Sequence, residues 1–150
     1  EQAGKLSAIV TQNIDGLHQA AGSKNVFELH GSVHRNYCQK CGKFFDVNYV
    51  VNAKRVPYCD ECGGIIKPDV VLYEEGLDSQ TINGAVRAIS KADMLIIGGT
   101  SLVVYPAAGM IDYFKGKYLA VLNRDATSRD KQADLCITDP IGEVLGRIRV

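Results

Sequence analysis

Residues 6–13, LSAIVTQN, pass directly from apolar and branched side chains to polar ones. A short run of this kind is typical of a buried strand in a parallel sheet. The polar residues that follow it, including Asn13, would then lie at the carboxyl edge of the sheet, where open α/β sheets bind their ligands. The stretch therefore predicts a parallel sheet with a ligand site at that edge.

The rest of the chain alternates between short apolar runs and segments of helical periodicity. Further strands are predicted at residues 25–29, 70–73, 93–97, 118–122 and 134–138, and helices at residues 15–22, 79–92, 106–114 and 141–148. The last helix is expected to begin with Asp139 as its capping residue and Pro140 at its first position. Strands that alternate with helices predict an α/β fold with a doubly wound, mostly parallel, Rossmann-like sheet.

Composition narrows the class of protein. The 150 residues are 46% apolar and carry 17 basic and 17 acidic side chains. A chain of this size can bury one core, and its balanced charge gives no reason to expect nucleic acid or a membrane surface as a partner. Its apolar runs are far shorter than the ~20 residues of a membrane span. The first ten residues lack the features of a signal peptide, so a cytoplasmic location is expected.

Two C-x2-C pairs stand seventeen residues apart: Cys38 with Cys41, and Cys59 with Cys62. This spacing falls in the range of four-cysteine zinc sites. Each pair lets one tight turn present two thiolates to the same ion, and a glycine follows each pair, which suits such a turn. Because four thiolates fill the coordination shell, the zinc ion is predicted to be structural and not catalytic.

The residues around these pairs, 37–66, lack helical periodicity and are predicted to form an inserted zinc-ribbon module. Residues 1–36 and 67–150 would together form the Rossmann-like domain that receives it. The fifth cysteine, Cys136, lies between apolar residues in a predicted strand. It is expected to be a small buried side chain without a chemical role.

Polar and small residues follow several of the predicted strands. His30 follows the strand at 25–29, as Asn13 and Asp15 follow the strand at 6–10, and these three are expected to meet at one sheet edge. A single histidine at a strand end is more often structural than catalytic, but this position favours chemistry. After the strand at 93–97, residues 99–101 are small enough for their backbone to approach a phosphate or ribose.

Taken in order, these segments resemble the sirtuin family of NAD-dependent protein deacylases, and its bacterial members most closely. The matching segments are TQNID at 11–15, ELHGS at 28–32, both cysteine pairs, KPDVV at 67–71, GTSL at 99–102 and Asn123. The resemblance covers the chain from about Lys5 onward. It implies a protein that removes acetyl or other acyl groups from protein lysines and yields nicotinamide and O-acyl-ADP-ribose.

The resemblance also assigns roles to residues. His30 would be the general base that activates a ribose hydroxyl of NAD, a role that suits an imidazole. The ribose and nicotinamide would be held by Gln12, Asn13, Ile14 and Asp15. The adenosine side would be held by Gly99, Thr100, Ser101, Asn123 and the turn that includes Ile141.

The acyl-lysine peptide would pair as an added strand with Val70 and Val71 and with the stretch at 102–105. His18 and His34 lie where the family motif assigns no chemistry, so both are expected to be structural. NAD and one structural zinc ion are the implied cofactors, and an acyl-lysine protein or peptide is the implied partner.

The chain departs from the family at its beginning, where no glycine-rich phosphate loop precedes residue 11. It is therefore expected to be the C-terminal portion of such an enzyme, and to bind NAD poorly by itself because it lacks the loop's backbone donors. Two alternatives remain open. One is a non-catalytic zinc ribbon that recognises a protein partner, and the other is an NAD-dependent ADP-ribosyltransferase.

Overall fold

The computed structural model describes residues 1–149 of the chain. By its contacts the chain divides into two compact units, Ile9–Thr81 on the one hand and Glu1–Ala8 with Ile82–Val150 on the other. The predicted division into residues 1–36 with 67–150 and an inserted module at 37–66 stays a prediction.

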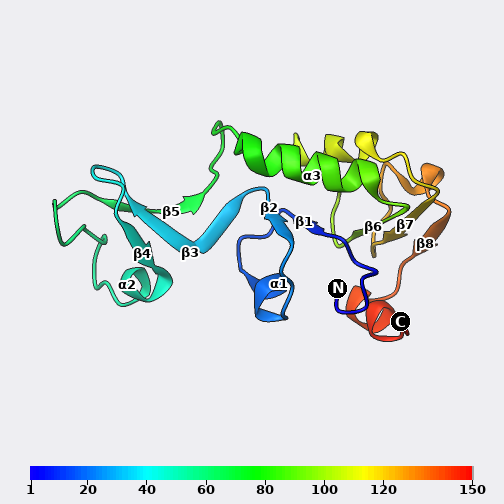
Figure 1. Ribbon diagram of the computed structural model, residues 1–150, viewed down its shortest axis with the longest axis horizontal. Coiled ribbons are helices and arrows are strands. Elements are labelled where there is room, and N and C mark those ends of the chain that lie inside the picture. The colour runs from blue at the N-terminus through cyan, green and yellow to red at the C-terminus, as the bar shows by residue number, and fades with distance from the viewer. Residues whose placement is uncertain (150) are drawn as a thin grey trace. The chain divides into compact units, whose positions relative to one another are not determined.

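The unit Ile9–Thr81 begins with two short parallel strands, and all of its elements are labelled in Figure 1. In chain order they are β1 (Ile9–Thr11), α1 (Leu17–Ala20), β2 (Val26–Glu28), β3 (Gly31–Cys38), β4 (Phe44–Asp46), α2 (Val47–Val51) and β5 (Ile66–Val70). Ile9 pairs with Val26 and Thr11 with Glu28, so β1 and β2 end side by side. Residues 12–15 and His30 therefore follow adjacent strand ends, as the sequence predicted.

The longest strand of this unit, β3, lies at the centre of an antiparallel sheet with the order β4-β3-β5. The helix α2 begins after Asp46, whose side chain accepts a hydrogen bond from the backbone N–H of Tyr49 at 2.9 Å, the usual way to cap a helix. The core of this region contains Phe45 and Ile66. Two of the predicted metal ligands, Cys38 and Cys59, complete the same cluster.

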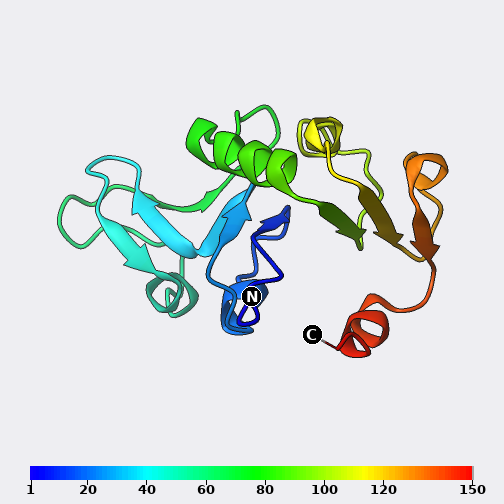
Figure 2. The same cartoon turned by 45° about the vertical axis from the view of Figure 1, so that its right-hand side comes forward.

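The other unit contains a three-stranded parallel sheet. Its elements are α3 (Ser79–Lys91, whose first residues lie before the unit boundary), β6 (Met94–Gly98), the 3-10 helix η1 (Ala107–Tyr113), β7 (Tyr118–Leu122), the 3-10 helix η2 (Asp130–Gln132), β8 (Leu135–Ile137) and α4 (Ile141–Gly146). The strands lie side by side in the order β6-β7-β8 (Figure 2). One face packs a core of Ile97, Leu102, Leu119 and Val121.

The helix α3 starts at a capping residue that periodicity alone did not indicate. The Asp78 carboxylate accepts hydrogen bonds from the backbone N–H of Thr81 at 2.7 Å and from its hydroxyl at 2.9 Å. Ala85 and Ile89 form its buried positions. Among the described residues no helix combines the length and the apolar character needed to cross a bilayer.

The structure confirms the α/β class with parallel strands and corrects several details. The pairings between described residues form three sheets. The strand predicted at 70–73 ends at Val70, because a turn follows in which the Glu75 carboxylate accepts a hydrogen bond from the N–H of Leu72 at 2.8 Å. The helix predicted at 106–114 is a 3-10 helix.

Two expectations about single residues are wrong. The capping position of α4 is Pro140, not Asp139, because the backbone of Pro140 is not yet helical (ψ 124°). No side chain caps the helix, since proline has no side-chain acceptor. Cys136 is exposed, since β8 is a three-residue strand at one end of its sheet. Its Sγ lies 3.6 Å from the carbonyl oxygen of Asp130.

Candidate active site and metal centre

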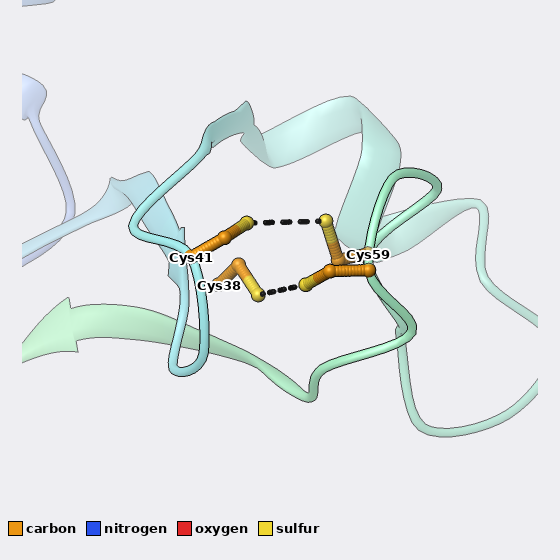
Figure 3. A group of neighbouring side chains, drawn as sticks. Cys38, Cys41 and Cys59 are labelled. Atoms are coloured by element: carbon orange, nitrogen blue, oxygen red, sulfur yellow. Dashed lines mark hydrogen bonds between the residues drawn. The ribbon is translucent and has the colours of Figure 1, made fainter.

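The four cysteine side chains of the C-x2-C pairs converge, as Figure 3 shows for their sulfur atoms. Their Sγ atoms all lie within 4.8 Å of one another, with 3.4 Å between Cys38 and Cys62 and 3.6 Å between Cys41 and Cys59. Four sulfur ligands about 2.3 Å from a zinc ion stand roughly 3.8 Å apart in a tetrahedron. The cluster therefore has the composition and the size of a closed zinc site.

Local turns explain this convergence. Gly42 and Gly63 directly follow the second cysteine of each pair. Their φ angles are positive, 74° and 68°, which residues with a side chain rarely adopt. Gly64 also passes so close to Cys38 that an added Cβ would lie 2.7 Å from its Sγ. The backbone N–H of Cys41, followed by that of Lys40, lowers the pKa of the Cys38 thiol to about 6. Hydrogen bonds with neighbouring thiols raise the pKa of Cys41 and of Cys62, so Cys38 is the first of these three to become the thiolate that metals bind.

An ion-pair group links the two cysteine turns. Lys43 follows the first turn, and its Nζ lies 2.7 Å from Asp60 and 2.9 Å from Glu61, both within the second C-x2-C pair. Asp60 and Glu61 together raise the pKa of Lys43. These groups are solvent-exposed, so the contribution of the pair to stability is small, but it restrains the spacing of the two turns.

His30 lies in the turn between β2 and β3, where its Nδ1 atom is 3.1 Å from the backbone carbonyl oxygen of Gln12. A carbonyl oxygen only accepts, so Nδ1 carries the proton in this hydrogen bond. In the neutral ring the other nitrogen, Nε2, then has a free lone pair. The hydrogen bond thus decides that Nε2 is the nitrogen of the neutral ring that can act as a general base.

The segment Gln12–Asp15 is shaped by hydrogen bonds at both ends. The hydroxyl of Thr11 accepts from the N–H of Asn13 at 3.1 Å, and the Asp15 carboxylate accepts from the N–H of Leu17 at 3.0 Å. Within the segment, the carbonyl of Ile14 accepts from a backbone N–H of β3. The structure therefore places the carbonyl of Gln12 against His30, and Asn13, Ile14 and Asp15 continue the same segment.

Val70 and Val71 also lie beside His30. Val70 is the register partner of Gly31, and the N–H of Val71 donates to the carbonyl of His30 at 3.0 Å. Hydrogen-bonded and non-hydrogen-bonded residue pairs alternate along an antiparallel ladder. Because the neighbouring pair His30 and Val71 is hydrogen-bonded, the pair Gly31 and Val70 is a non-hydrogen-bonded one. The N–H and carbonyl of Val70 consequently point away from β3, toward the outer edge of the sheet.

Two ion pairs of Arg35 near His30 were missed by sequence reasoning. Arg35 donates from Nη1 to the Glu28 carboxylate at 2.6 Å and from Nε to Asp69 at 2.8 Å. The side chain of Glu28 is only 8% exposed. Arg35 thereby ties the end of β2 to β5 on either side of the His30 turn. No local pattern indicates the link to β5, because Asp69 lies 34 residues from Arg35 in the sequence.

The remaining predicted residues lie in the unit with β6, β7 and β8. Gly99 donates its N–H to the carbonyl of Leu122, directly before Asn123, so these two predicted residues lie at the same sheet edge. The side chain of Ile141 packs against Gly98, where an added Cβ would collide with it. Thr100 and Ser101 follow Gly99 in the chain. The predicted residues thus form two groups, one in each unit.

This second unit also contains a cavity of about 410 Å³, which is not lined by the predicted site residues. It is lined by Ile111, Asp112, Phe114, Gly116, Lys117, Leu119, Arg129, Gln132 and Asp134. Its arginine is already paired, since Nη2 of Arg129 lies 2.6 Å from the Asp112 carboxylate. None of these residues was singled out from the sequence.

Several known proteins are similar to this chain over almost its whole length. Residues 1–106 match the model of the Sir2 family. The chain is 67% identical over 146 residues to an NAD-dependent protein deacetylase of Clostridium acetobutylicum. The aligned region covers 97% of this chain and 60% of that protein. It is 66% identical to one of Clostridium perfringens, over 99% of this chain and 61% of that protein. The chain thus spans about 60% of the length of these curated relatives.

Solved structures of Sir2 are also similar to this chain. A structure of Sir2 with a p53 peptide and NAD+ is 38% identical, with a TM-score of 0.89 over 97% of this chain and 63% of that one. A structure of Sir2 bound to an acetylated peptide has a TM-score of 0.88 at 38% identity, over 97% of this chain and 63% of that one.

Proposed function

This chain belongs to the Sir2 family, and on that premise we propose that the whole protein removes acyl groups from protein lysines in an NAD-dependent reaction. The products would be nicotinamide, the free lysine and O-acyl-ADP-ribose. The observation that carries the proposal is the hydrogen bond from His30 to Gln12, because it leaves a basic nitrogen among the residues predicted to hold NAD.

His30 acts in this proposal as the general base. Its Nε2 accepts the proton of a ribose hydroxyl, while Nδ1 stays bonded to the carbonyl of Gln12. The backbone bond between His30 and Val71 places this ring next to the strand proposed for the substrate. One short segment of β3 and β5 thus serves both the base and the peptide.

The residues proposed to hold NAD fit the two halves of that molecule. The carbonyl of Gln12 contacts His30, and the segment of Gln12, Asn13, Ile14 and Asp15 would hold the nicotinamide and its ribose. When bound, NAD would supply the ribose that takes up the acyl group and the nicotinamide that leaves. The adenosine half suits the strand ends at Gly99, Thr100, Ser101, Asn123 and Ile141. There, Gly99 has a positive φ of 61° and offers backbone without a side chain.

The acyl-lysine peptide would add to the outer edge of β5. Val70 directs its N–H and carbonyl toward this edge, and main-chain hydrogen bonds of an added strand supply affinity for any extended peptide. The carbonyl of Val70 already accepts from Nζ of Lys67 at 2.9 Å. We therefore assign the N–H of Val70 to the peptide.

The zinc ion would have a structural role only. The four thiolates fill a tetrahedral shell, which leaves no position for a water or a substrate. We propose that residues 37–66 are a zinc module inserted into an NAD-binding domain made of 1–36 and 67–150. We further propose a cytoplasmic location, because cysteines that serve as metal ligands are typical of a reducing compartment.

The proposal is tested with the whole protein, NAD and an acetylated peptide, by measuring nicotinamide release by chromatography. Release is expected to require the acetylated peptide. His30→Ala is expected to lower the rate by about 10²–10⁴-fold, the usual contribution of a general base. His30→Asn is the sharper variant, since its amide nitrogen can replace Nδ1 as donor to Gln12 but cannot act as the base.

Both variants should keep one zinc ion per chain, which shows that the loss is chemical and not a failure to fold. Nicotinamide release that continued unchanged in His30→Asn would refute the proposal. Peptide binding without any dependence on NAD would favour the non-catalytic zinc ribbon. Transfer of label from NAD to protein would favour the ADP-ribosyltransferase.

A further inference from the structure

The loop Gln12–Gly16, called the 12–16 loop below, is held by an irregular part of β3. We propose that His34 is a positioning residue that holds this loop, and through it His30, in the arrangement that the reaction needs. The inference rests on the proposed function, because it assumes that the 12–16 loop holds part of NAD. It assigns a role to a histidine that the sequence motif left without one.

The irregularity is a break in the register of β3 with β5. Ser32 pairs with Asp69, but Asn36 pairs with the adjacent Pro68, so residues 33–35, called the β3 bulge, have no partner in β5. The bulge is internally braced: Asn36 is 1% exposed, and its side-chain amide donates to the carbonyl of Val33 at 3.1 Å. Strands bend at bulges and redirect their side chains.

The redirected groups reach the 12–16 loop. The N–H of Val33 donates to the carbonyl of Ile14 at 3.0 Å, and the ring of His34 donates from Nε2 to the carbonyl of Asp15 at 2.9 Å. Because a carbonyl only accepts, Nε2 carries a proton in this bond. The charged ring keeps the same donor, so the contact serves to hold the loop and not to sense pH.

The shape of the loop fits the ring of His34. Gly16 has a positive φ of 69°, and a Cβ added there would lie 2.7 Å from Cδ2 and 2.8 Å from Nε2 of His34. The ring therefore occupies the place that a side chain at residue 16 would take. His34 itself is exposed, so burial of apolar surface does not explain why a ring stands there.

The same loop accepts the hydrogen bond that sets the tautomer of His30. The carbonyl of Gln12 accepts from Nδ1 of His30, three residues before the carbonyl that His34 holds. Three donors from β3 and the turn before it thus fix the loop at Gln12, Ile14 and Asp15. If His34 is removed, the loop loses one of these, and both the NAD contacts and the acceptor of His30 become less well positioned.

The test uses three variants that separate the donor from the ring. In His34→Gln the amide nitrogen can take the position of Nε2, in His34→Asn it takes that of Nδ1, and His34→Ala has no donor. In the whole protein, His34→Ala and His34→Asn are expected to lower kcat/KM for NAD by about five- to tenfold, the effect of one hydrogen bond. The KM for acetylated peptide should stay within about twofold, and His34→Gln should restore most of the loss.

A second readout needs neither NAD nor activity. Amide hydrogen exchange over residues 12–20 should be about five- to tenfold faster in His34→Ala and His34→Asn, and close to the wild-type rate in His34→Gln. The control is His18→Ala. His18 uses its backbone carbonyl, which the substitution keeps, to accept from the N–H of Ser23. Zinc content should remain one per chain in every variant.

Gly16→Ala approaches the same contact from the loop side. It should lower kcat/KM for NAD as His34→Ala does, and the double variant should lose less than the product of the two single effects. Equal kinetics and equal exchange in His34→Ala and the wild type would overturn the inference, as would a His34→Gln variant as impaired as His34→Ala. A wild-type protein that releases no nicotinamide would instead refute the proposed function, while the exchange rates would still decide whether His34 holds the loop.

Discussion

Removal of zinc should unfold the region around the cysteine pairs while the unit with β6, β7 and β8 stays folded. The perturbation is chelation of the metal, together with Cys59→Ala, which deletes one ligand. Cys136→Ala is the matched control, because Cys136 is exposed and lies outside the four-cysteine cluster.

The size of the effect follows from the small core of this region. Apart from Cys38 and Cys59, its buried cluster contains only Phe45, 5% exposed, and Ile66, 3% exposed. Burying two such side chains contributes about 1.5–3 kcal/mol each. Binding of a structural zinc ion contributes about 10–16 kcal/mol, so the metal stabilises this region more than its apolar core does. Without it, the two apolar side chains cannot hold the strands and turns together.

The assay is hydrogen exchange of the whole protein with and without chelator, with zinc measured by mass spectrometry. Loss of protection is expected over residues 37–66, and protection of β7 should remain. Because β3 begins next to His30 and ends at Cys38, loss of the zinc region should also lower activity. The reasoning is wrong if zinc-free protein keeps full protection over residues 37–66, or if Cys136→Ala loses zinc as Cys59→Ala does.

Two further predictions concern the backbone near His30 and the start of α3. Gly31 has a φ of 76°, and an added Cβ would collide with the backbone carbonyl of Asp69. Gly31→Ala should therefore cost at least about 1–3 kcal/mol in urea unfolding, and an unchanged midpoint would contradict this. Hydrogen bonds from the N–H and the hydroxyl of Thr81 hold the pKa of Asp78 below its ordinary value of 3.8. A lowered carboxyl pKa adds stability above that value and loses it as the pH falls, so the difference in melting temperature between wild type and Asp78→Ala should shrink below pH 3.8. A difference that stays constant down to about pH 2 would argue against the cap.

Local patterns predicted much of the fold and of the candidate site. The strand Tyr118–Leu122 has the predicted bounds, and the short helix α1 lies inside its predicted range. The zinc ligands were predicted correctly as a cluster because a C-x2-C turn is set by neighbouring residues alone. His30 and the 12–16 loop came together as expected because parallel strands end at a common edge.

Errors arose where the folded conformation, and not the residue type, decides the outcome. The exposure of Cys136 depends on the position of β8 in its sheet. The absence of an Asp139 cap depends on the backbone conformation at Pro140. Neither can be derived from the order of apolar residues, because burial and capping are fixed by the surroundings of a segment in the folded chain.

The sequence by itself determined the class of fold and predicted the clustering of the four cysteines and the proposed catalytic histidine, because strand periodicity, turn spacing and strand ends are local properties. Only the tertiary structure decided the tautomer of His30, the outward direction of Val70 and the contact of His34 with the 12–16 loop. The tautomer of His30 depends on its place beside the end of β1, whereas the direction of Val70 and the contact of His34 depend on the register of β3 against β5 and on the bulge at residues 33–35. These contacts join residues at least 18 positions apart, and hydrogen bonds between such residues leave no periodic trace in the chain.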